Sequence, residues 1–350
     1  MEPAGEGHVG TNTPVNTSAV SSDAPADAEA QHSRQTRHLA LTNAHPLDAR
    51  IVFDEEKHVY FVDGARYPTS VSGVVHQYFP SFDATACVEQ YYDRWKADKK
   101  SRYYQFIAYL ENVLQLPEDV AKAEICASWS ASGGKASADG TATHLAIELD
   151  LNSQAPEQHH LDSPEFKQYA RWRETHPTWV PYRTEWSVFD QDTLLCGQID
   201  SIWRDAETGA FYMVDWKRVL KLERTNNFGE RGYAPLDGLH NTNLSHYVLQ
   251  QNLYAWMLRR NYGVDVAAMY LLQVHPSIDE AAEVPVPFIR EEIDVIVDTR
   301  RAKVAAGELK TVAASSRKRP CDEAEPACKA RATRNAALRA LYTRLADALK

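Results

Sequence analysis

The sequence predicts a mixed α/β fold in which helices flank a central β-sheet. Apolar, strand-like segments alternate along the chain with amphipathic segments of helical spacing. The strand-like segments span residues 182–189, 194–203, 211–216, 266–274 and 283–289, and the clearest helical ones span residues 244–262 and 293–306. The turn-prone residues 205–209 join two strands directly into an antiparallel hairpin, so we expect parallel and antiparallel strands to mix in one sheet.

The hairpin at residues 194–216 carries the first candidate site. Asp200 lies within its first apolar strand, and Asp215 and Lys217 follow in the run VDWKR. Side chains alternate along a strand, so Asp215 and Lys217 share one face and Trp216 occupies the other. Carboxylates in apolar strands are costly to bury unless a cation or hydrogen bonds satisfy them. Asp200, Asp215 and Lys217 together suit a divalent hard cation. The alternative is an edge hairpin whose Asp and Lys side chains simply face water.

A helical segment before the hairpin adds two more candidates. In the run ADGTATHLAIELD, His144 and Glu148 are four positions apart and share a helix face. Gly140 precedes the histidine by four positions, where we expect the start of a helix to pass close to a backbone or a phosphate. We expect a separate helix at residues 121–130 and a Gly/Ser loop between the two.

A second helical segment, residues 244–262, follows the hairpin. Its apolar positions recur at helical spacing, and Gln250 and Tyr254 are four positions apart on one face. Alone, this is an ordinary amphipathic helix, just as His144 alone would be an ordinary surface or core histidine.

Together these motifs resemble the RecB-like exonuclease branch of the PD-(D/E)xK nuclease superfamily, in the form found in eukaryotes and large DNA viruses. Their order along the chain is GxxxH, GxxD, DxK and QxxxY, and a glutamate stands in the strand before the hairpin, where family members commonly carry one. The matching residues are Gly140, His144, Glu185, Gly197, Asp200, Asp215, Lys217, Gln250 and Tyr254. The resemblance covers about 130 residues, from Trp129 to Tyr262, and Arg218 departs from the small hydroxyl residue often found after the lysine.

The resemblance implies a restriction-endonuclease-like core and a site for Mg²⁺ or Mn²⁺. His144, Asp200, Asp215 and the backbone carbonyl of Trp216 would be the metal ligands. An imidazole ligand suits Mn²⁺ somewhat better than Mg²⁺, which prefers oxygen and water. The metal would lower the pKa of its bound water and polarise the phosphoryl oxygen.

The resemblance also assigns roles to side chains around the metal. Lys217 would orient or deprotonate the attacking water and neutralise charge on the transition state. Glu185 would assist the metal or the water as a second catalytic residue, and Glu148 is a possible additional acid. Gln250 and Tyr254 would brace the site or contact the DNA strand without performing chemistry.

We therefore expect a metal-dependent deoxyribonuclease, and more specifically an exonuclease in DNA repair, recombination or replication. The exonuclease preference rests on the resemblance, since GxxxH and QxxxY are features of the RecB-like branch. Three alternatives stay open: a structure-specific endonuclease, a nuclease that acts on RNA, and a catalytically silent nucleic-acid-binding module. The intact set of His144, Asp200, Asp215 and Lys217 disfavours the silent module.

Composition divides the chain into three parts. Residues 1–49, rich in Ala, Ser, Thr, Asn and Pro, are predicted to be a disordered leader. Residues 50–310 form the expected nuclease domain, with an N-terminal part up to residue 128 and the catalytic core from residue 129. Residues 311–350 form a basic tail or helix, and the last fifty residues have 12 basic and 5 acidic side chains. That tail would contact a phosphate backbone or simply be solvated.

The expected partner is DNA, despite the net charge of −10. Residues 51–300 have 23 basic and 37 acidic side chains, net −14, and part of this excess is expected of a site that collects carboxylates for metals. No apolar run approaches the length of a membrane span, so no membrane association is expected. The cluster Arg317, Lys318 and Arg319 favours a nuclear over a mitochondrial location.

The N-terminal part of the expected domain combines a β-hairpin and helices. The hairpin spans residues 50–71 with a tight turn at Asp63 and Gly64, and helices are expected at residues 70–78, 85–99 and 103–114. Aromatic side chains crowd this region and would stack on unpaired bases or, more commonly, pack a core. They are Tyr91, Tyr92, Trp95, Tyr103, Tyr104 and Tyr109.

The five cysteines are scattered and odd in number, which favours a reducing compartment. Some RecB-like nucleases hold an iron–sulfur cluster on four cysteines, three of them after the core. Here only Cys321 and Cys328 follow it, so no cluster is expected. Cys196 is expected to be a buried strand residue.

Overall fold

The computed structural model describes residues 38–226 and 228–313 of the 350-residue chain. Its main sheet has five strands in the order β4-β5-β6-β7-β8. Their bounds are β4 (Trp179–Asp190), β5 (Leu195–Asp205), β6 (Phe211–Arg218), β7 (Val266–Val274) and β8 (Ala282–Val286). Neighbouring strands pair antiparallel except β6 and β7, which run parallel. The predicted mixed α/β fold with a mixed central sheet is confirmed.

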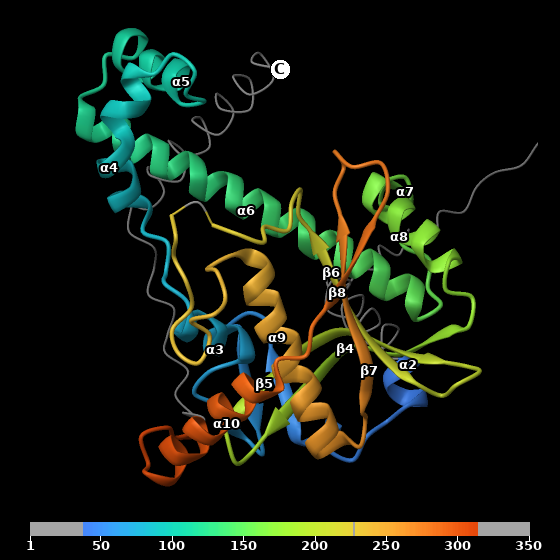
Figure 1. Cartoon of the computed structure of the whole chain (residues 1–350). Coiled ribbons are helices and arrows are strands. Elements are labelled where there is room, and N and C mark those ends of the chain that lie inside the picture. The colour runs from blue at the N-terminus through green and yellow to red at the C-terminus, as the bar shows by residue number, and fades with distance from the viewer. Residues whose placement is uncertain (1–37, 227, 314–350) are drawn as a thin grey trace, which may run out of the picture. The chain divides into compact units, whose positions relative to one another are not determined.

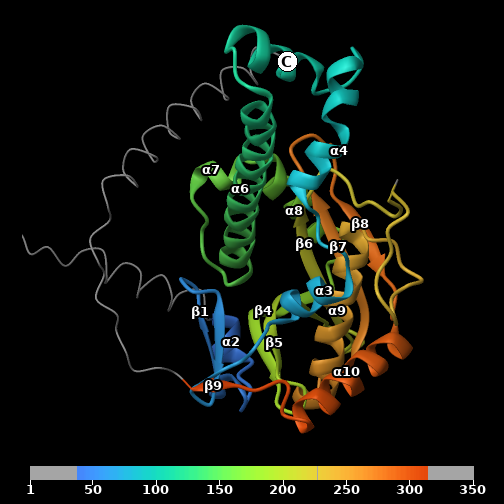
Figure 2. The same ribbon diagram turned by 90° about the vertical axis from the view of Figure 1, so that its left-hand side faces the viewer.

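Helices cover both faces of this sheet. On one face α3 (Val71–Tyr78), α9 (Asn243–Met257) and α10 (Arg290–Ala305) contribute to a core with β4 to β8. On the other face α2 (His38–Thr42), α6 (Glu118–Leu151) and α8 (Pro164–Glu174) surround a smaller core rich in tryptophan. Figure 2 shows β6 and β7 between α6 and α9.

The parallel pairing of β6 and β7 follows from the helical crossover between them. Helix α9 begins after Thr242, whose side chain accepts a hydrogen bond from the Ser245 amide. It continues into a π-helical turn, η3 (Leu258–Tyr262), which ends at Gly263 in the left-handed conformation. The chain then enters β7 beside the strand that it left.

A second, smaller sheet precedes the main one. It has the order β1-β2-β3-β9, with β1 (Ile51–Asp54), β2 (Val59–Val62), β3 (Ala65–Arg66) and β9 (Val312–Ala313). Asp63 and Gly64 both have positive φ, as a tight hairpin turn requires. The predicted N-terminal hairpin is therefore confirmed, and its buried side chains pack with Phe189 and Leu194 near the end of β4.

The helical part of the N-terminal region has a hydrophobic core of its own. It consists of α4 (Ala84–Ala97), α5 (Tyr104–Ala108), a π-helical turn η2 (Tyr109–Val113) and the first turns of α6 (Figure 1). The buried side chains of this core are Val88, Tyr92, Ile107, Leu110, Ala121 and Ile125. Of the crowded aromatic side chains, only Tyr92 is among these buried residues.

Helix α6 corrects one expectation. In place of two helices and a Gly/Ser loop, a single 34-residue helix runs from Glu118 to Leu151. Glycine costs up to about 1 kcal/mol in a helix interior, but both ends of α6 are held by packing. Ile125 lies in the N-terminal helical core and Ile147 in the tryptophan-rich core. Gly140 therefore lies inside a helix and not at its start.

Among the elements that were not predicted from the sequence, two helices pack into the tryptophan-rich core. Helix α8 begins with Ser163 as its N-cap and Pro164 in its first turn, a recognisable start signal. Helix α2 lies within the stretch expected to be a disordered leader, and its Leu39 is buried in the tryptophan-rich core. The short helices η1 (Asp48–Arg50) and α7 (Gln158–Leu161) complete the described elements.

Several expectations concern residues outside the described ranges. They are the leader up to residue 37, the basic tail from residue 314, the cluster at residues 317–319, and Cys321 and Cys328. Within the described ranges, Cys196 is buried on β5 as expected. None of the described helices is long and apolar enough to cross a membrane.

Candidate active site

The site forms where β5 and β6 separate. Their regular pairing runs from Arg204 opposite Phe211 to Ser201 opposite Val214 and stops there. At the next position, the Asp200 carboxylate accepts a hydrogen bond of 3.1 Å from the Trp216 amide. A side-chain oxygen thus takes the place of a backbone acceptor, which holds Asp200 against β6.

His144 reaches the same peptide from α6. Its Nε2 atom lies 2.9 Å from the Trp216 carbonyl oxygen. A carbonyl only accepts, so this nitrogen carries the proton. The other ring nitrogen, Nδ1, lies 3.5 Å from Asp200 Oδ2. Histidine ligands of metals commonly donate their second N–H to such a carbonyl, which leaves the first nitrogen free for the metal.

Glu185 completes a group of three metal donors. It lies on β4 between Thr184, opposite Ser201, and Trp186, opposite Ile199, so it faces Asp200 across the ladder. One donor atom each from His144, Glu185 and Asp200 lie within 4.8 Å of one another. Two oxygens on opposite sides of an ion with bonds of about 2.1–2.5 Å are about 4–5 Å apart. The three side chains are therefore spaced to hold a metal ion.

The backbone at Glu185 is strained. Its φ is +43°, which is rare for a residue with a side chain. Such conformations cost on the order of 1 kcal/mol or more and concentrate at functional sites. Glu185 lies in the middle of the twelve-residue strand β4. Its unusual backbone conformation interrupts the strand at the position where its carboxylate lies near Asp200.

Asp215 and Lys217 lie together beside this group. Asp215 Oδ2 is 2.6 Å from Lys217 Nζ, but the approach lacks hydrogen-bond geometry, and this buried oxygen has no hydrogen-bond partner among the described residues. Burial raises the pKa of Asp215 to about 7; the nearby Asp200 adds to this increase and Lys217 opposes it. A buried carboxylate beside a second carboxylate, with one lysine as its ion-pair partner, fits the surroundings of a divalent cation.

Glu185 shares this environment. Burial raises its pKa well above the ordinary range, and the negative charges of Asp200, Glu148 and Asp215 raise it further. The charged form of Glu185 is thus disfavoured by burial and by three neighbouring carboxylates. A bound cation would lower the pKa of these carboxyl groups again, because a nearby opposite charge favours the ionised form.

Lys217 lies between two acidic groups and an aromatic ring. Burial lowers its pKa, but the charges of Asp215 and Asp200 outweigh this effect and raise the pKa overall. Its ammonium also lies 4.6 Å from the centroid of the Tyr247 ring. The surroundings of Lys217 therefore favour its protonated form.

Trp216 joins the site to the core. Its ring packs edge-to-face against Tyr169, Trp172 and Trp203 on the α6 side of the sheet. Its amide and carbonyl meanwhile bind Asp200 and His144. The predicted alternation of Asp215, Trp216 and Lys217 between the two faces agrees with this packing. The carbonyl, expected as a metal ligand, is here a hydrogen-bond acceptor for His144.

Gly197 and Tyr254 belong to separate motifs and meet in the structure. A Cβ atom at Gly197 would lie 2.7 Å from the hydroxyl oxygen of Tyr254 and 2.8 Å from a ring carbon. Tyr254 is buried on α9, and its side chain hydrogen-bonds with Gln250 one turn earlier. The structure thus places Tyr254 as a brace between α9 and β5.

Two other predicted residues, Glu148 and Gly140, lie outside the group of metal donors. Glu148 lies one turn after His144, and burial, with a contribution from Glu55, raises its pKa to about 7. It is not part of the three-residue donor group. A Cβ at Gly140 would have no atom within 4 Å, so the expected close approach of another backbone is not found among the described residues.

The sequence reasoning missed the partners of Arg218. Its guanidinium pairs with Glu165 at 2.7 Å and with Asp139 at 3.2 Å, which links β6 to α8 and α6. Glu165 is buried, so this pairing supplies its charge compensation. The arginine that departs from the family pattern therefore has a structural role. Tyr247 was expected only as an apolar helix position, and its contact with Lys217 was also missed.

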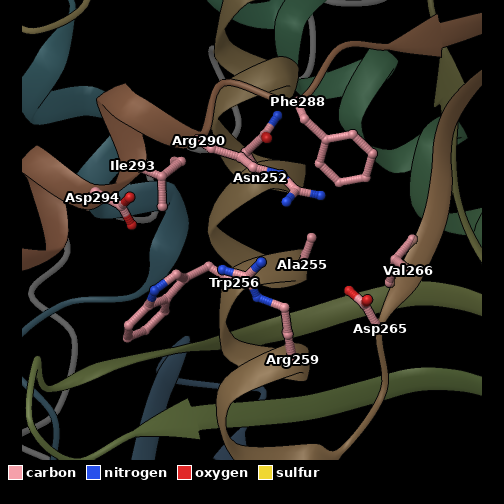
Figure 3. A pocket seen from close by; sticks show the side chains of 10 residues that line it. All are labelled: Asn252, Ala255, Trp256, Arg259, Asp265, Val266, Phe288, Arg290, Ile293 and Asp294. Carbon is pink, nitrogen blue, oxygen red and sulfur yellow. The ribbon is translucent and has the colours of Figure 1, made fainter.

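Two hollows lie away from the carboxylate cluster. Figure 3 shows a small one between α9, α10 and the start of β7, lined among others by Trp256, Arg259, Asp265 and Arg290. Its volume of about 30 Å³ has room for one or two water molecules, not for a nucleotide. The second is a much larger groove between α4, the start of α6 and the loop at Phe228.

Comparisons with known proteins find only weak structural likenesses to this chain. No protein-family model matches the chain, and no curated protein matches it. The crystal structure of a "Putative exonuclease" from Eubacterium rectale is 12% identical, covers 71% of this chain and 80% of its own, and has a TM-score of 0.27. The crystal structure of SSO0001 is 13% identical, covers 81% and 87%, and has a TM-score of 0.28. Nothing about function is inferred from likenesses this weak.

Proposed function

We propose that this protein is a metal-dependent deoxyribonuclease of the PD-(D/E)xK superfamily that degrades DNA from its ends. One observation carries the proposal. His144, Glu185 and Asp200, from α6, β4 and β5, place three metal donors within 4.8 Å of one another beside the Asp215–Lys217 pair of β6. The exonuclease assignment, and with it the RecB-like branch, rests on the order of the GxxxH and QxxxY motifs.

The donor set suits Mg²⁺ or Mn²⁺. His144 Nδ1, Glu185 and Asp200 would hold the ion, with Asp215 as the third carboxylate beside it. The ion would supply positive charge that polarises a phosphoryl oxygen and makes a water molecule more acidic. One imidazole among carboxylates leaves Mn²⁺ as acceptable as Mg²⁺.

Side chains around the ion would stabilise charge, transfer a proton and hold the site together. The Lys217 ammonium, held between Asp215 and the Tyr247 ring, would donate a hydrogen bond to the water or to a phosphoryl oxygen and stabilise negative charge there. Glu185, which is one of the three donors, would assist the metal or accept a proton from the water. Gln250 and Tyr254 would hold α9 against β5.

Degradation of end-labelled linear and covalently closed circular DNA tests this proposal. Reactions contain Mg²⁺, Mn²⁺ or EDTA, and wild type is compared with Lys217→Ala. Lys221→Ala is the matched control, because Lys221 lies just beyond β6 with 71% of its side chain exposed. We expect metal-dependent loss of linear DNA only, a reduction of at least about a hundredfold in Lys217→Ala, and no change in the control.

Other outcomes separate the alternatives. Cutting of the circle would replace the exonuclease by a structure-specific endonuclease with the same chemistry, and cutting of RNA alone would change the substrate. Binding of nucleic acid without cleavage in either metal would favour the silent module. We further propose that the activity serves DNA repair, recombination or replication in the nucleus, a location that the basic cluster at residues 317–319 favours.

A further inference from the structure

The larger hollow is an open groove lined by aromatic side chains. Its volume is about 680 Å³. The aromatic side chains that line it are Phe82, Tyr91, Trp95, Tyr103, Trp129 and Phe228, and we call this surface the aromatic groove. Phe82 and Phe228 are 72% and 70% exposed, which is unusual for side chains of this size.

The rings form a connected series, in which Trp95, Tyr103 and Trp129 are partly buried against the helical core and the other rings extend outward. Trp95 stacks on Tyr91 at 5.9 Å and lies 4.4 Å from Tyr103. Trp129 lies about 6 Å from both Trp95 and Tyr103, and Phe82 and Phe228 extend the series at its two ends. A nucleobase would supply a π-face for these rings.

Positive charge surrounds these rings. Residues 94–102 contain five basic side chains and one acidic one, net +4, whereas residues 51–300 as a whole are net −14. Four of the five are exposed and form no ion pair within the described ranges, namely Arg94, Lys99, Lys100 and Arg102. Arg94 and Arg102 themselves line the aromatic groove, together with one acidic side chain, Asp98. Stacking rings beside uncompensated cations match bases joined by phosphates.

Helix α6 connects the aromatic groove to the site. Trp129 and His144 are fifteen positions apart on one continuous helix, a rise of about 22 Å. At about 100° per residue, the two side chains leave the helix within about 60° of the same direction. Between them on that side lie Gly133, Ala136 and Gly140, and a Cβ atom added at either glycine would have no other atom within 4 Å. A strand of about six nucleotides, at about 3.4 Å each, spans this length.

We propose that the aromatic groove binds unpaired nucleotides of a single DNA strand, which then follows α6 to the carboxylate cluster. This inference rests on the proposed function for the identity of the nucleic acid. The bases stack on the aromatic rings, and Arg94 and Arg102 contact the phosphates. Blunt duplex DNA has no unpaired bases to offer and does not enter the groove.

Binding of a fluorescein-labelled twenty-nucleotide oligo-dT to the full chain, in EDTA to prevent cleavage, tests the proposal. Phe82→Ala and Phe228→Ala remove exposed side chains, so both variants are expected to fold. We expect each to weaken binding between about fivefold and a hundredfold. Tyr233→Ala is the matched control, because Tyr233 is 55% exposed and does not line the aromatic groove. Its affinity should equal that of wild type.

Two further readouts identify the contacts. Arg94→Gln should lower the slope of log K against log salt by about 0.7, the value for one phosphate contact on a single strand. A blunt duplex of equal length should compete poorly with oligo-dT. Equal affinity of the phenylalanine variants and wild type, or equal competition by the duplex, would overturn the proposal, as would failure of wild type to bind.

The two proposals can fail separately. If wild type binds oligo-dT through the aromatic groove but cleaves nothing with either metal, the nuclease proposal fails and the groove stands. If wild type degrades DNA and the groove variants bind and degrade it equally well, the groove fails and the nuclease stands. Saturation of the groove by an apolar peptide without any binding of oligo-dT would assign it to a protein partner.

Discussion

The peptide of Trp216 is the point at which fold and site meet. Its amide donates to Asp200 and its carbonyl accepts from His144, while the residue as a whole is 2% exposed and belongs to the tryptophan-rich core. The sequence allowed the pattern of Asp215 and Lys217 to be predicted, because side chains alternate on any strand. It did not allow prediction of the backbone contacts, since these depend on where β5 and β6 separate.

Residue-level prediction also failed where the partner is distant in sequence. Glu165 and Arg218 are 53 positions apart, and the motif around Lys217 gives no sign that Arg218 needs a buried carboxylate. The same holds for Gly197, whose need for a small side chain becomes evident only with Tyr254 beside it.

Gly197→Ala should destabilise the protein by about 1–3 kcal/mol, because the added methyl group overlaps the buried Tyr254 ring. Tyr254→Phe in the same chain should recover part of this loss, since the hydroxyl oxygen is the nearest atom. Urea unfolding of the two single variants and the double variant measures the coupling. Strictly additive effects would show that the two motifs do not meet.

The carboxylate cluster should make the metal-free protein sensitive to pH. The pKa of Asp215 is raised from 3.8 to about 7, so its contribution to stability is present below about pH 4 and is lost as pH rises through 7. The shift corresponds to on the order of 4 kcal/mol. Asp200→Asn removes a repelling neighbour, so the variant should gain stability over wild type between pH 5 and pH 8 in EDTA.

Thermal unfolding at several pH values measures this difference. Millimolar Mn²⁺ should stabilise wild type and have little effect on Asp200→Asn, because a ligand that binds only the folded state adds stability. Glu157→Gln is a suitable control, since the Glu157 side chain is 81% exposed. Parallel stability curves for wild type and Asp200→Asn would contradict the electrostatic account.

Among the elements, α6 shows what local sequence can and cannot predict. Gly and Ser between residues 130 and 137 favour a loop by propensity, and that expectation was wrong. Packing at the two helix ends decided the outcome, and packing is not visible in a local segment. The strands of the main sheet, in contrast, were located correctly because their apolar runs and turn residues are local signals.

Gly133→Ala and Gly134→Ala test the continuity of α6. Both positions are exposed, and a Cβ atom would meet no other atom within 4 Å. Alanine should therefore stabilise the helix by about 0.5–1 kcal/mol at each position. Circular dichroism and urea unfolding provide the measurements. A loss of stability in either variant would indicate a loop in which glycine adopts positive φ.

For the molecule as a whole, the arrangement of cores predicts unequal stability. The two cores on the faces of the main sheet share β5, β6 and β7 and should unfold together. The helical part around α4 has a core of six buried residues that includes no residue of the main sheet. Regions with fewer buried contacts open at lower free energy.

Native-state amide exchange should therefore be faster in α4 and α5 than in β5 and β6. We expect the opening free energy of amides in residues 84–108 to be lower by at least about 2 kcal/mol. Protection of both regions to the same level would show that α6 transmits the stability of the sheet to the helical part. Oligo-dT should raise protection in α4 selectively.

The number of residues in α6 sets the distance between the aromatic groove and the candidate active site. An insertion of seven residues near its middle would displace the aromatic groove by about 10 Å and keep it on the same side, whereas an insertion of five would turn it by about 140°. In-frame insertions and deletions between residues 131 and 137 would thus change the distance between the aromatic groove and the candidate site, while every side chain of the site stays the same. Under the proposed function, variation in the length of α6 would therefore change how far the bound strand extends before it reaches the carboxylates.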